Sequence, residues 1–288
     1  MLKNFAVFIL SHGRPDRITT YKLLKRSGYT GLIYIIIDNE DKKAERYYQN
    51  YGKQVIMFNK EEIEKEIDTA DNFGNRQTIL HARCACFDIA KQLGIKYFIQ
   101  LDDDYIQFAY RRDNNFDYKW KLIRNLDKIF DILLEYYKII PALSIAISQG
   151  GDFIGGENSY YAKIGEVKRK CMNSFICSVD RRFNFHGTMN EDVNTYCLLG
   201  SQGNLFLTIP SLTLTQQSSQ QNKSGIVETY LKYGTYVKSF YTVMHNPSSV
   251  FISILNSKYI RIHHSVKWDN TVPMIIEEKY KKTKNKEV

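Results

Sequence analysis

Three consecutive aspartates, Asp102, Asp103 and Asp104, directly follow an apolar run at residues 96–101. That run has the length and composition of a central strand of a mixed sheet, covered on both faces. Adjacent carboxylates repel one another and raise one another's pKa. A divalent cation that prefers oxygen ligands removes this penalty, and its open side binds phosphate. We therefore predict a metal site that faces a phosphate; the alternative is a solvated turn rich in aspartate.

A second acidic pair, Glu191 and Asp192, follows Asn190 and precedes an apolar pattern that predicts a helix from Glu191 through Leu199. Acidic residues in the first turn of a helix complement its dipole. The pair is therefore either a structural helix start or a catalytic pair presented at a helix N-terminus. On the residues alone, the structural interpretation is favoured.

The loop after the first predicted strand contains Ser11, His12, Gly13 and Arg14, and a helix is expected to begin near Asp16. Glycine allows close approach of the backbone, while arginine and a helix N-terminus attract anions. The loop could hold a phosphate or a nucleoside. It has neither the GxGxxG nor the GxxxxGK pattern, so neither a dinucleotide-binding fold nor a P-loop is predicted.

Asp38 ends the second predicted strand and brings another carboxylate to the same edge of the sheet, where open α/β sheets bind their ligands. It could accept a hydrogen bond from a ribose or a base, or it could cap the next helix. Arg76 and Arg83 are two turns apart on a helix predicted over residues 76–93. We therefore expect both arginines to face one locus.

Two pairs of adjacent residues are further candidates. Gly150 and Gly151 follow a predicted strand and indicate either backbone that lies against a ligand or a flexible loop, with equal weight. His263 and His264 follow another predicted strand. A lone histidine is more often structural than a ligand, and a neighbouring histidine raises the odds of a ligand only somewhat.

Strand and helix patterns alternate through the first 105 residues, which predicts an α/β protein with a mainly parallel sheet. Further strands are predicted at residues 5–10, 32–37, 54–58, 142–148, 174–179, 205–209, 250–255 and 259–262, and further helices near 16–27, 122–137 and 226–240. Residues 111–118 and 216–224 are predicted to be polar loops, the latter mobile. The only plausible subdivision lies near residue 140.

The composition is that of a globular protein with an anionic partner. The 288 residues include 40 Lys and Arg against 31 Asp and Glu, a net charge of +9, which favours nucleic acid or a phosphorylated substrate. Solubility alone is the alternative. Five cysteines without CxxC spacing argue against a disulfide framework or a zinc ribbon and indicate a reducing cytoplasm. No stretch approaches the roughly 20 apolar residues of a membrane span, and no obligate protein partner is evident.

In the order of these motifs the chain resembles glycosyltransferases of the GT-A fold, which use nucleotide sugars. The resemblance rests on ILSHGRP at residues 9–15, on Asp38 and on the DXD motif at 102–104, and more weakly on residues 190–192 and the histidines near 263. More narrowly, the segments SHGRPDR, GYTG, IIIDNED and FIQLDDDY are similar to phage-encoded TET-associated glycosyltransferases. The resemblance implies a GT-A, Rossmann-like fold with a mixed, mainly parallel sheet flanked by helices.

The resemblance also implies a role for each candidate. Asp102 and Asp104 would hold Mg²⁺ or Mn²⁺ on the donor diphosphate, with His263 or His264 completing the coordination sphere. Asp38 and the loop at 11–14 would bind the nucleoside, and Arg76 or Arg83 the phosphates. The expected donor-binding set comprises Ser11, His12, Gly13, Arg14, Asp38, Arg76, Arg83, Asp102, Asp103, Gly150 and Gly151.

For the chemistry, the resemblance implies transfer from a nucleotide sugar, a UDP-sugar by family expectation, to the hydroxyl of a 5-hydroxymethylpyrimidine in DNA. Asp192, with Glu191 beside it, would be the catalytic base of an inverting enzyme, whereas a retaining enzyme needs no such base. Residues 1–140 would form the donor-binding half, 141–275 the acceptor-binding and catalytic half, and 276–288 a flexible basic tail. A phage protein would work in the cytoplasm of its host.

Two other functions compete with this one. A GT-A glycosyltransferase could act on a glycan, lipid or protein acceptor. Alternatively, a non-catalytic nucleic-acid-binding protein would use its acidic residues only as turns and caps, and would not depend on divalent metal.

Overall fold

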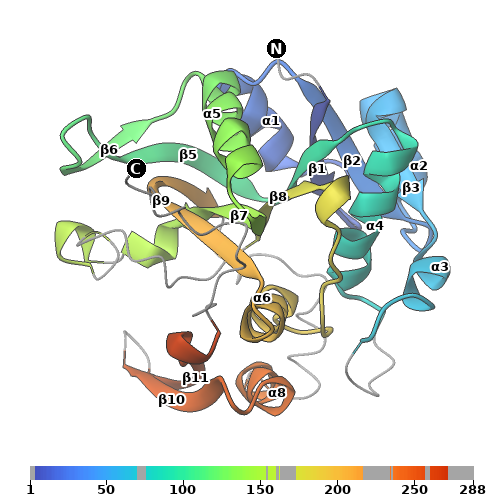
Figure 1. Ribbon diagram of the computed structural model, residues 1–288. Helices are drawn as coiled ribbons and strands as arrows, with labels where there is room; N and C mark the ends of the chain where they lie inside the picture. The colour runs from blue at the N-terminus through green and yellow to red at the C-terminus, as the bar shows by residue number, and fades with distance from the viewer. Residues whose placement is uncertain are drawn as a thin grey trace, which may run out of the picture.

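Four of the predicted strands form a parallel set in the computed structural model of the chain (Figure 1). They are β1 (Phe5–Leu10), β2 (Leu32–Asp38), β3 (Val55–Phe58) and β4 (Tyr97–Asp102). Leu10 pairs with Ile36 of β2 on one side and with Asp102 of β4 on the other. Because these strands are parallel, the residues that follow them meet at one edge of the sheet, as predicted.

The sheet continues beyond β4 in mixed directions. Its nine strands have the order β3-β2-β1-β4-β8-β7-β9-β5-β6. The later strands are β5 (Tyr105–Arg112), β6 (Tyr118–Leu122), β7 (Ala142–Gln149), β8 (Ser174–Ser178) and β9 (Leu205–Gln216). Strand β8 is antiparallel to β4 and β7, β9 is parallel to β7, and β5 is antiparallel to β9 and β6. The predicted α/β class with a mixed sheet is confirmed.

The structure describes residues 4–69, 76–153, 155–159, 162, 173–216, 234, 236–256 and 260–271. The basic segment at 163–170 and the tail at 276–288 lie outside these ranges. Within them, no helix is long and apolar enough to cross a membrane. The described cysteines, Cys84, Cys86, Cys177 and Cys197, are buried.

Helices cover both faces of the sheet (Figure 1). They are α1 (Thr19–Arg26), α2 (Ala44–Tyr51), α3 (Lys60–Glu64), α4 (Leu80–Gln92), α5 (Leu126–Ile139), α6 (Glu191–Ser201) and α8 (Val237–His245). Short 3₁₀ turns are η1 (Gly52–Gln54), η2 (Gly150–Phe153), η3 (Gly156–Asn158), η4 (Val179–Arg181) and η6 (Trp268–Asn270). The helix that begins at Glu191 is confirmed.

Several predicted boundaries are wrong. The helix expected from Arg76 begins at Leu80, where the Thr78 hydroxyl accepts the Leu80 N–H at 3.3 Å, and α1 begins at Thr19 rather than near Asp16. The loop predicted over residues 111–118 contains the ends of β5 and β6. Gln216, predicted to begin a mobile loop, is the last residue of β9, and residues 217–224 lie outside the described ranges.

The C-terminal part adds a second, two-stranded sheet of β10 (Val250–Asn256) and β11 (Ile260–Val266), beside α8 at the lower edge in Figure 1. Of the helix predicted over 226–240, only residues 234 and 236–240 are described, and α8 begins at Val237. The two histidines predicted to follow a strand lie within β11: His263 pairs with Ser253 and His264 with Ile252.

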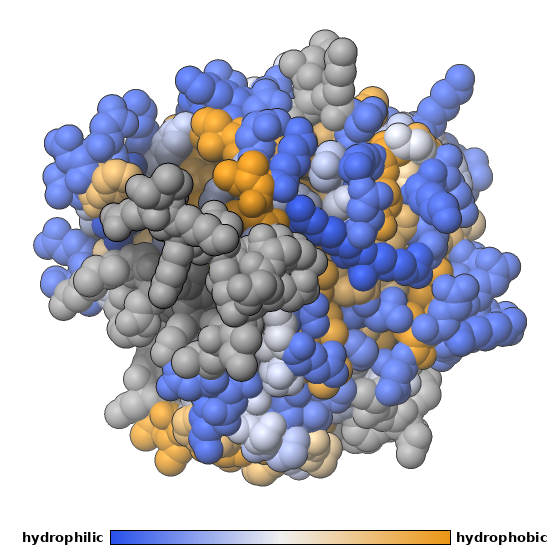
Figure 2. Space-filling view, viewed as in Figure 1, coloured by the Kyte–Doolittle hydropathy of each residue, from blue (hydrophilic) through white to orange (hydrophobic). Residues whose placement is uncertain are grey.

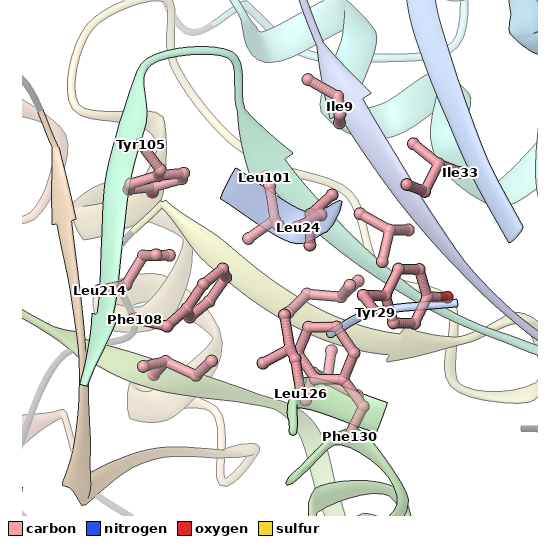
Figure 3. Packing of buried hydrophobic residues seen from close by; sticks show 14 of the residues in the cluster. Ile9, Leu24, Tyr29, Ile33, Leu101, Tyr105, Phe108, Leu126, Phe130 and Leu214 are labelled. Carbon is pink, nitrogen blue, oxygen red and sulfur yellow. The ribbon is translucent and has the colours of Figure 1, made fainter. Parts of the chain in front are cut away.

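Alternation along β1 divides the core into two clusters, one on each face of the sheet. Val7 and Ile9 belong to the cluster covered by α1 and α5, whereas Ala6 and Phe8 belong to the one covered by α4 and α6. Figure 3 shows the first cluster, in which Phe130 of α5 lies among side chains of the sheet and α1. The near-continuous burial of β1 is the pattern expected for a strand covered on both faces.

The face shown in Figure 2 is largely hydrophilic, with apolar side chains gathered over α5 and along the lower edge where β10 and β11 lie. The exposed apolar residues of these elements include Ile132 and Ile139 on α5 and Ile254 and Ile260 on the two-stranded sheet.

The start of α1 holds the backbone of the turn that joins β4 to β5. The Thr20 hydroxyl donates to the carbonyl of Asp102 at 2.6 Å and accepts the N–H of Tyr105 at 2.9 Å. The Thr20 N–H and the Thr19 hydroxyl donate to the carbonyl of Asp103, at 3.1 and 3.2 Å. The conformation of the acidic turn is therefore set from outside the turn.

We expect Thr20→Val to lower the free energy of unfolding by about 2–3 kcal/mol, because it leaves a buried carbonyl and a buried N–H without partners. Thr20→Ser keeps the hydroxyl and should lose much less. Urea unfolding of both variants measures the difference, and equal stabilities would contradict this role of the hydroxyl.

Candidate active site

The three aspartates at the end of β4 point to different partners. Asp103 accepts a hydrogen bond from the Ser11 hydroxyl at 2.6 Å and forms an ion pair with Arg14 at 3.2 Å. Asp102 and Asp104 instead meet at the side-chain amide of Gln216, whose Nε2 lies 3.3 Å from Asp102 Oδ2 and 2.7 Å from Asp104 Oδ1. Asp103 therefore has different partners from Asp102 and Asp104, which share one.

The contacts of Asp103 fix the loop after β1. The Ser11 hydroxyl lies 2.7 Å from the Tyr47 hydroxyl, which also accepts the N–H of Arg14 at 2.8 Å. The N–H of Gly13 donates to Asp41 at 2.6 Å. The predicted loop is therefore held in place by Tyr47 of α2 and by the carboxylates of Asp41 and Asp103.

Arg83 joins the end of β4 to the start of α6. Its Nη2 donates to Asp102 Oδ1 at 3.0 Å and its Nε to Glu191 Oε1 at 2.9 Å, while the guanidinium lies over the rings of Phe175 and Phe185. The side chain is fully buried. One cation thus faces two carboxylates, and the negative charge of this site exceeds what Arg83 balances.

The burial of these acids shifts the pKa values of the ionisable side chains in the site. Burial raises the pKa of Asp102 to about 7 against the opposing charge of Arg83, with Asp104 and Glu191 raising it further. Burial also raises the pKa of Asp103 to about 6, against Arg14 and Ser11, and it raises the pKa of Glu191. Although burial opposes the charge of Arg83, Asp102 and Glu191 outweigh it and raise the Arg83 pKa.

Asp38 lies at the same edge in a different electrostatic environment. It accepts from His12 Nδ1 at 2.7 Å and from Lys60 Nζ at 3.0 Å. Burial would raise its pKa, but these hydrogen bonds and charges outweigh burial and lower the pKa to about 2. The hydrogen bond to Asp38 in turn raises the pKa of His12, against partial burial. His12 is the exposed member of the group, with 46% of its side chain accessible.

The start of α6 presents the second acidic pair. Asn190 adopts a left-handed conformation with φ 52° and donates from its side chain to the carbonyl of Lys238 and the hydroxyl of Thr242, at 2.8 and 2.7 Å. Glu191 turns to Arg83, and Asp192 is buried with Oδ1 accepting the N–H of Val193 at 2.8 Å. The two acids therefore have different surroundings, although both sit in the first turn.

The expectation that Arg76 and Arg83 face one locus is wrong. Arg76 precedes α4 and pairs with Glu40 and Glu64 at the surface, at 3.1 and 3.2 Å. Arg83 is inside α4, and both of its ion pairs are buried. The predicted helical spacing fails because α4 begins only at Leu80.

The histidines are not part of the acidic cluster either. Among the described residues, no three His, Cys, Asp or Glu side chains are grouped so that they could hold a metal. His263 and His264 lie in the two-stranded β10–β11 sheet, whereas Asp102 ends a strand of the nine-stranded sheet. That one of these histidines completes the coordination sphere stays a prediction.

Gly150 and Gly151 lie in η2, directly after β7. A Cβ on Gly150 would stand 3.1 Å from the hydroxyl of Thr215 on β9, whereas one on Gly151 would meet nothing within 4 Å. Gly150 thus packs closely against the Thr215 side chain of β9, and neither glycine has a described contact with the acidic cluster.

Several residues that contact the predicted site were not among the candidates, and Thr20, Lys60 and Gln216 are three of them. Lys60 lies in a charged segment that reads as solvated, yet it is buried against Asp38. Gln216 lies in a polar run. Of these three residues, only Lys60 could have been predicted from the sequence, because it follows a strand of the same parallel set. The sequence around Thr20 and Gln216 gives no indication of a role in the site.

The family model for TET-Associated Glycosyltransferase matches residues 5–225 of the chain. No curated protein matches it. Among solved structures, glucosyl-3-phosphoglycerate synthase from Mycobacterium tuberculosis in complex with Mn²⁺ and UDP-glucose is 10% identical, with a TM-score of 0.44 over 91% of this chain and 86% of that one. S. aureus TarS 1–349 in complex with UDP is 10% identical, with a TM-score of 0.40 over 73% and 60%.

We expect Arg83→Met to lower the free energy of unfolding by about 3–5 kcal/mol, because it leaves Asp102 and Glu191 buried without a counter-charge. Arg76→Met is the matched control and should cost about 1 kcal/mol or less, since its pairs are partly solvated. Urea unfolding at neutral pH separates the two, and similar losses would contradict the buried bridge.

Asp38 should stabilise the fold at all but acid pH. Its folded pKa of about 2 lies below the ordinary value of 3.8, so its stabilisation is complete above pH 4 and disappears as the pH falls towards 2. We expect Asp38→Asn to cost about 2 kcal/mol at pH 6, from nearly two pKa units, and almost nothing near pH 2.

Denaturant unfolding between pH 6 and pH 2 measures this difference. Asp16→Asn is the control, because Asp16 pairs with Arg46 at the exposed surface and solvent screens that pair. A cost of Asp38→Asn that does not change with pH would refute the assignment.

Proposed function

The chain belongs to the TET-associated glycosyltransferase family, and from that premise we propose that it transfers a sugar from a UDP-sugar to the hydroxyl of a 5-hydroxymethylpyrimidine in DNA. The observation that supports this most directly is the convergence of Asp102 Oδ2 and Asp104 Oδ1 on one point at the carboxyl edge of the sheet. Ligands of open α/β sheets bind at this edge.

A divalent cation fits the two aspartates. Their oxygens lie within 3.3 Å of a single atom, Gln216 Nε2, and Mg²⁺ and Mn²⁺ prefer carboxylate oxygens. Burial raises the pKa of Asp102, and Asp104 and Glu191 raise it further; a cation beside these acids would favour their charged forms. Bound there, Mg²⁺ or Mn²⁺ would stabilise the charge of the departing diphosphate. Asp103 is left to its structural contacts with Ser11 and Arg14.

We assign the nucleoside to the loop after β1. Asp38 has its oxygens occupied by His12, Lys60 and a backbone N–H of Glu40. Its part is therefore to orient His12, whose accessible ring can contact the base or ribose. The backbone at Gly13, held by Asp41, sets the position of that ring.

The residues of α6 serve the acceptor. The acceptor oxygen attacks the anomeric carbon, and the bond from that carbon to the diphosphate breaks with its electron pair leaving on the diphosphate. Asp192 takes the proton of the acceptor hydroxyl, and the product has inverted configuration. Glu191 is a positioning residue, because its carboxylate is held by Arg83.

DNA as the acceptor is supported by the family and by the net charge of +9. A protein that neutralises phosphates with lysine and arginine binds more weakly as salt rises. The target base must leave the stack to expose its hydroxyl at the site. A glycan, lipid or protein acceptor requires neither property.

The test is sugar transfer from a panel of UDP-sugars to DNA that contains 5-hydroxymethylcytosine, with Mn²⁺ or with EDTA. We expect transfer only with the metal, abolition by Asp104→Asn, and a loss of about 10²-fold or more in Asp192→Asn from removal of the base. Asp131→Asn, an exposed substitution on α5, is the control and should keep full activity.

Each other outcome has a defined meaning. Metal-dependent hydrolysis of a UDP-sugar without modification of DNA would keep the donor site and overturn the acceptor. A product with retained configuration would overturn the role of Asp192 as a base. If no UDP-sugar gives transfer or hydrolysis, the proposal fails and a nucleic-acid-binding role takes its place.

A further inference from the structure

Gln216 occupies the point where the two site carboxylates converge. Its side-chain amide lies 2.7 Å from Asp104 and 3.3 Å from Asp102. Both contacts are made by the same nitrogen atom, so the two carboxylate oxygens and the amide group surround one small volume. A third side chain able to bind a hard cation is therefore already at the site.

The strands hold Gln216 in this place. Gln216 pairs with Tyr105, the residue that follows Asp104, in the antiparallel ladder of β5 and β9. The other edge of β9 is paired with β7, where Leu214 lies opposite Gln149. The side chain thus reaches the aspartates from a strand paired on both edges.

We propose that Gln216 is a ligand of the divalent cation and binds it through the side-chain carbonyl oxygen. This inference rests on the proposed function, which supplies the cation. A half-turn about the terminal Cγ–Cδ bond exchanges Nε2 and Oε1, so the amide that donates to the carboxylates in their metal-free form presents its oxygen to the same volume. Glutamine carbonyls are ordinary ligands of hard cations.

This assignment supplies a third protein ligand without the histidines of β11. Two carboxylate oxygens and one amide oxygen leave three positions of an octahedral ion for diphosphate oxygens and water, which is typical of cations that bridge protein and phosphate. The competing explanation is that Gln216 only relieves repulsion between two carboxylates, in which case its amide competes with the cation.

The two explanations predict opposite changes in metal affinity for Gln216→Leu. If Gln216 is a ligand, Mn²⁺ binding should weaken at least about tenfold. If the amide is a competitor, its removal should tighten Mn²⁺ binding. Titration calorimetry and the electron paramagnetic resonance of free Mn²⁺ measure the dissociation constant without any need for turnover.

Two further variants make the test complete. Gln216→Glu keeps an oxygen at the same reach and should bind Mn²⁺ at least as well as the wild type, which also guards against misfolding of the leucine variant. Gln107→Leu is the matched control on β5 and should leave binding unchanged. His263→Ala and His264→Ala should also leave it unchanged.

The failure of this inference is distinguishable from failure of the proposed function. If the wild type binds Mn²⁺ and Asp104→Asn does not, but Gln216→Leu binds equally well or more tightly, only the role of Gln216 is overturned. If wild type and Asp104→Asn are alike in showing no Mn²⁺ binding, with or without UDP, the metal site itself is overturned, and the present inference with it.

Discussion

Three carboxylates on consecutive residues at the end of a buried strand are the constraint around which this structure is arranged. Their mutual repulsion in a region of low dielectric must be dispersed or the turn does not fold. The chain disperses it by giving each acid a different neighbour: Asp103 has Ser11 and Arg14, Asp102 has Arg83, and Asp104 has Gln216. Since these neighbours come from the loop after β1, from α4 and from β9, the acidic turn connects most of the molecule.

Arg83 links the two acidic groups of the site. It is buried on α4, yet its two hydrogen bonds reach the end of β4 and the start of α6. A change in the charge of Asp102 therefore alters the electrostatic environment of Glu191, because both carboxylates bind the guanidinium of Arg83. Buried charge clusters of this kind contribute little net stability. The bridge through Arg83 is therefore better explained by its effect on geometry, because it fixes the first turn of α6 relative to the strand that carries Asp102 and precedes Asp104.

Much of this architecture could be predicted from the sequence. The apolar runs that end in Asp38 and Asp102 are long and uniform, so their burial and their common edge follow from pattern alone. The expectation that Arg76 and Arg83 face one locus arose from their spacing on a helix that was predicted to begin one turn too early. The roles of Thr20 and Gln216 could not be predicted, because each depends on tertiary placement of a residue whose local surroundings are ordinary. His263 and His264 were predicted to be metal ligands from the order of motifs along the chain. That order does not predict how far the histidines lie from Asp102 and Asp104.

The contacts that define the acidic turn join residues far apart along the chain. Ser11 and Asp103 are separated by 92 positions, Arg83 and Glu191 by 108, and Asp104 and Gln216 by 112. Contacts of such sequence separation carry a loop-closure entropy that grows slowly with the length of the loop. A nascent chain that ends before residue 216 has the parallel strands, the acidic turn and the partners of Asp102 and Asp103, but it lacks Gln216, the partner of Asp104. The acidic turn is therefore completed only when β9 joins the sheet, so a competent site depends on the chain through residue 216 and is not a property of its N-terminal half alone.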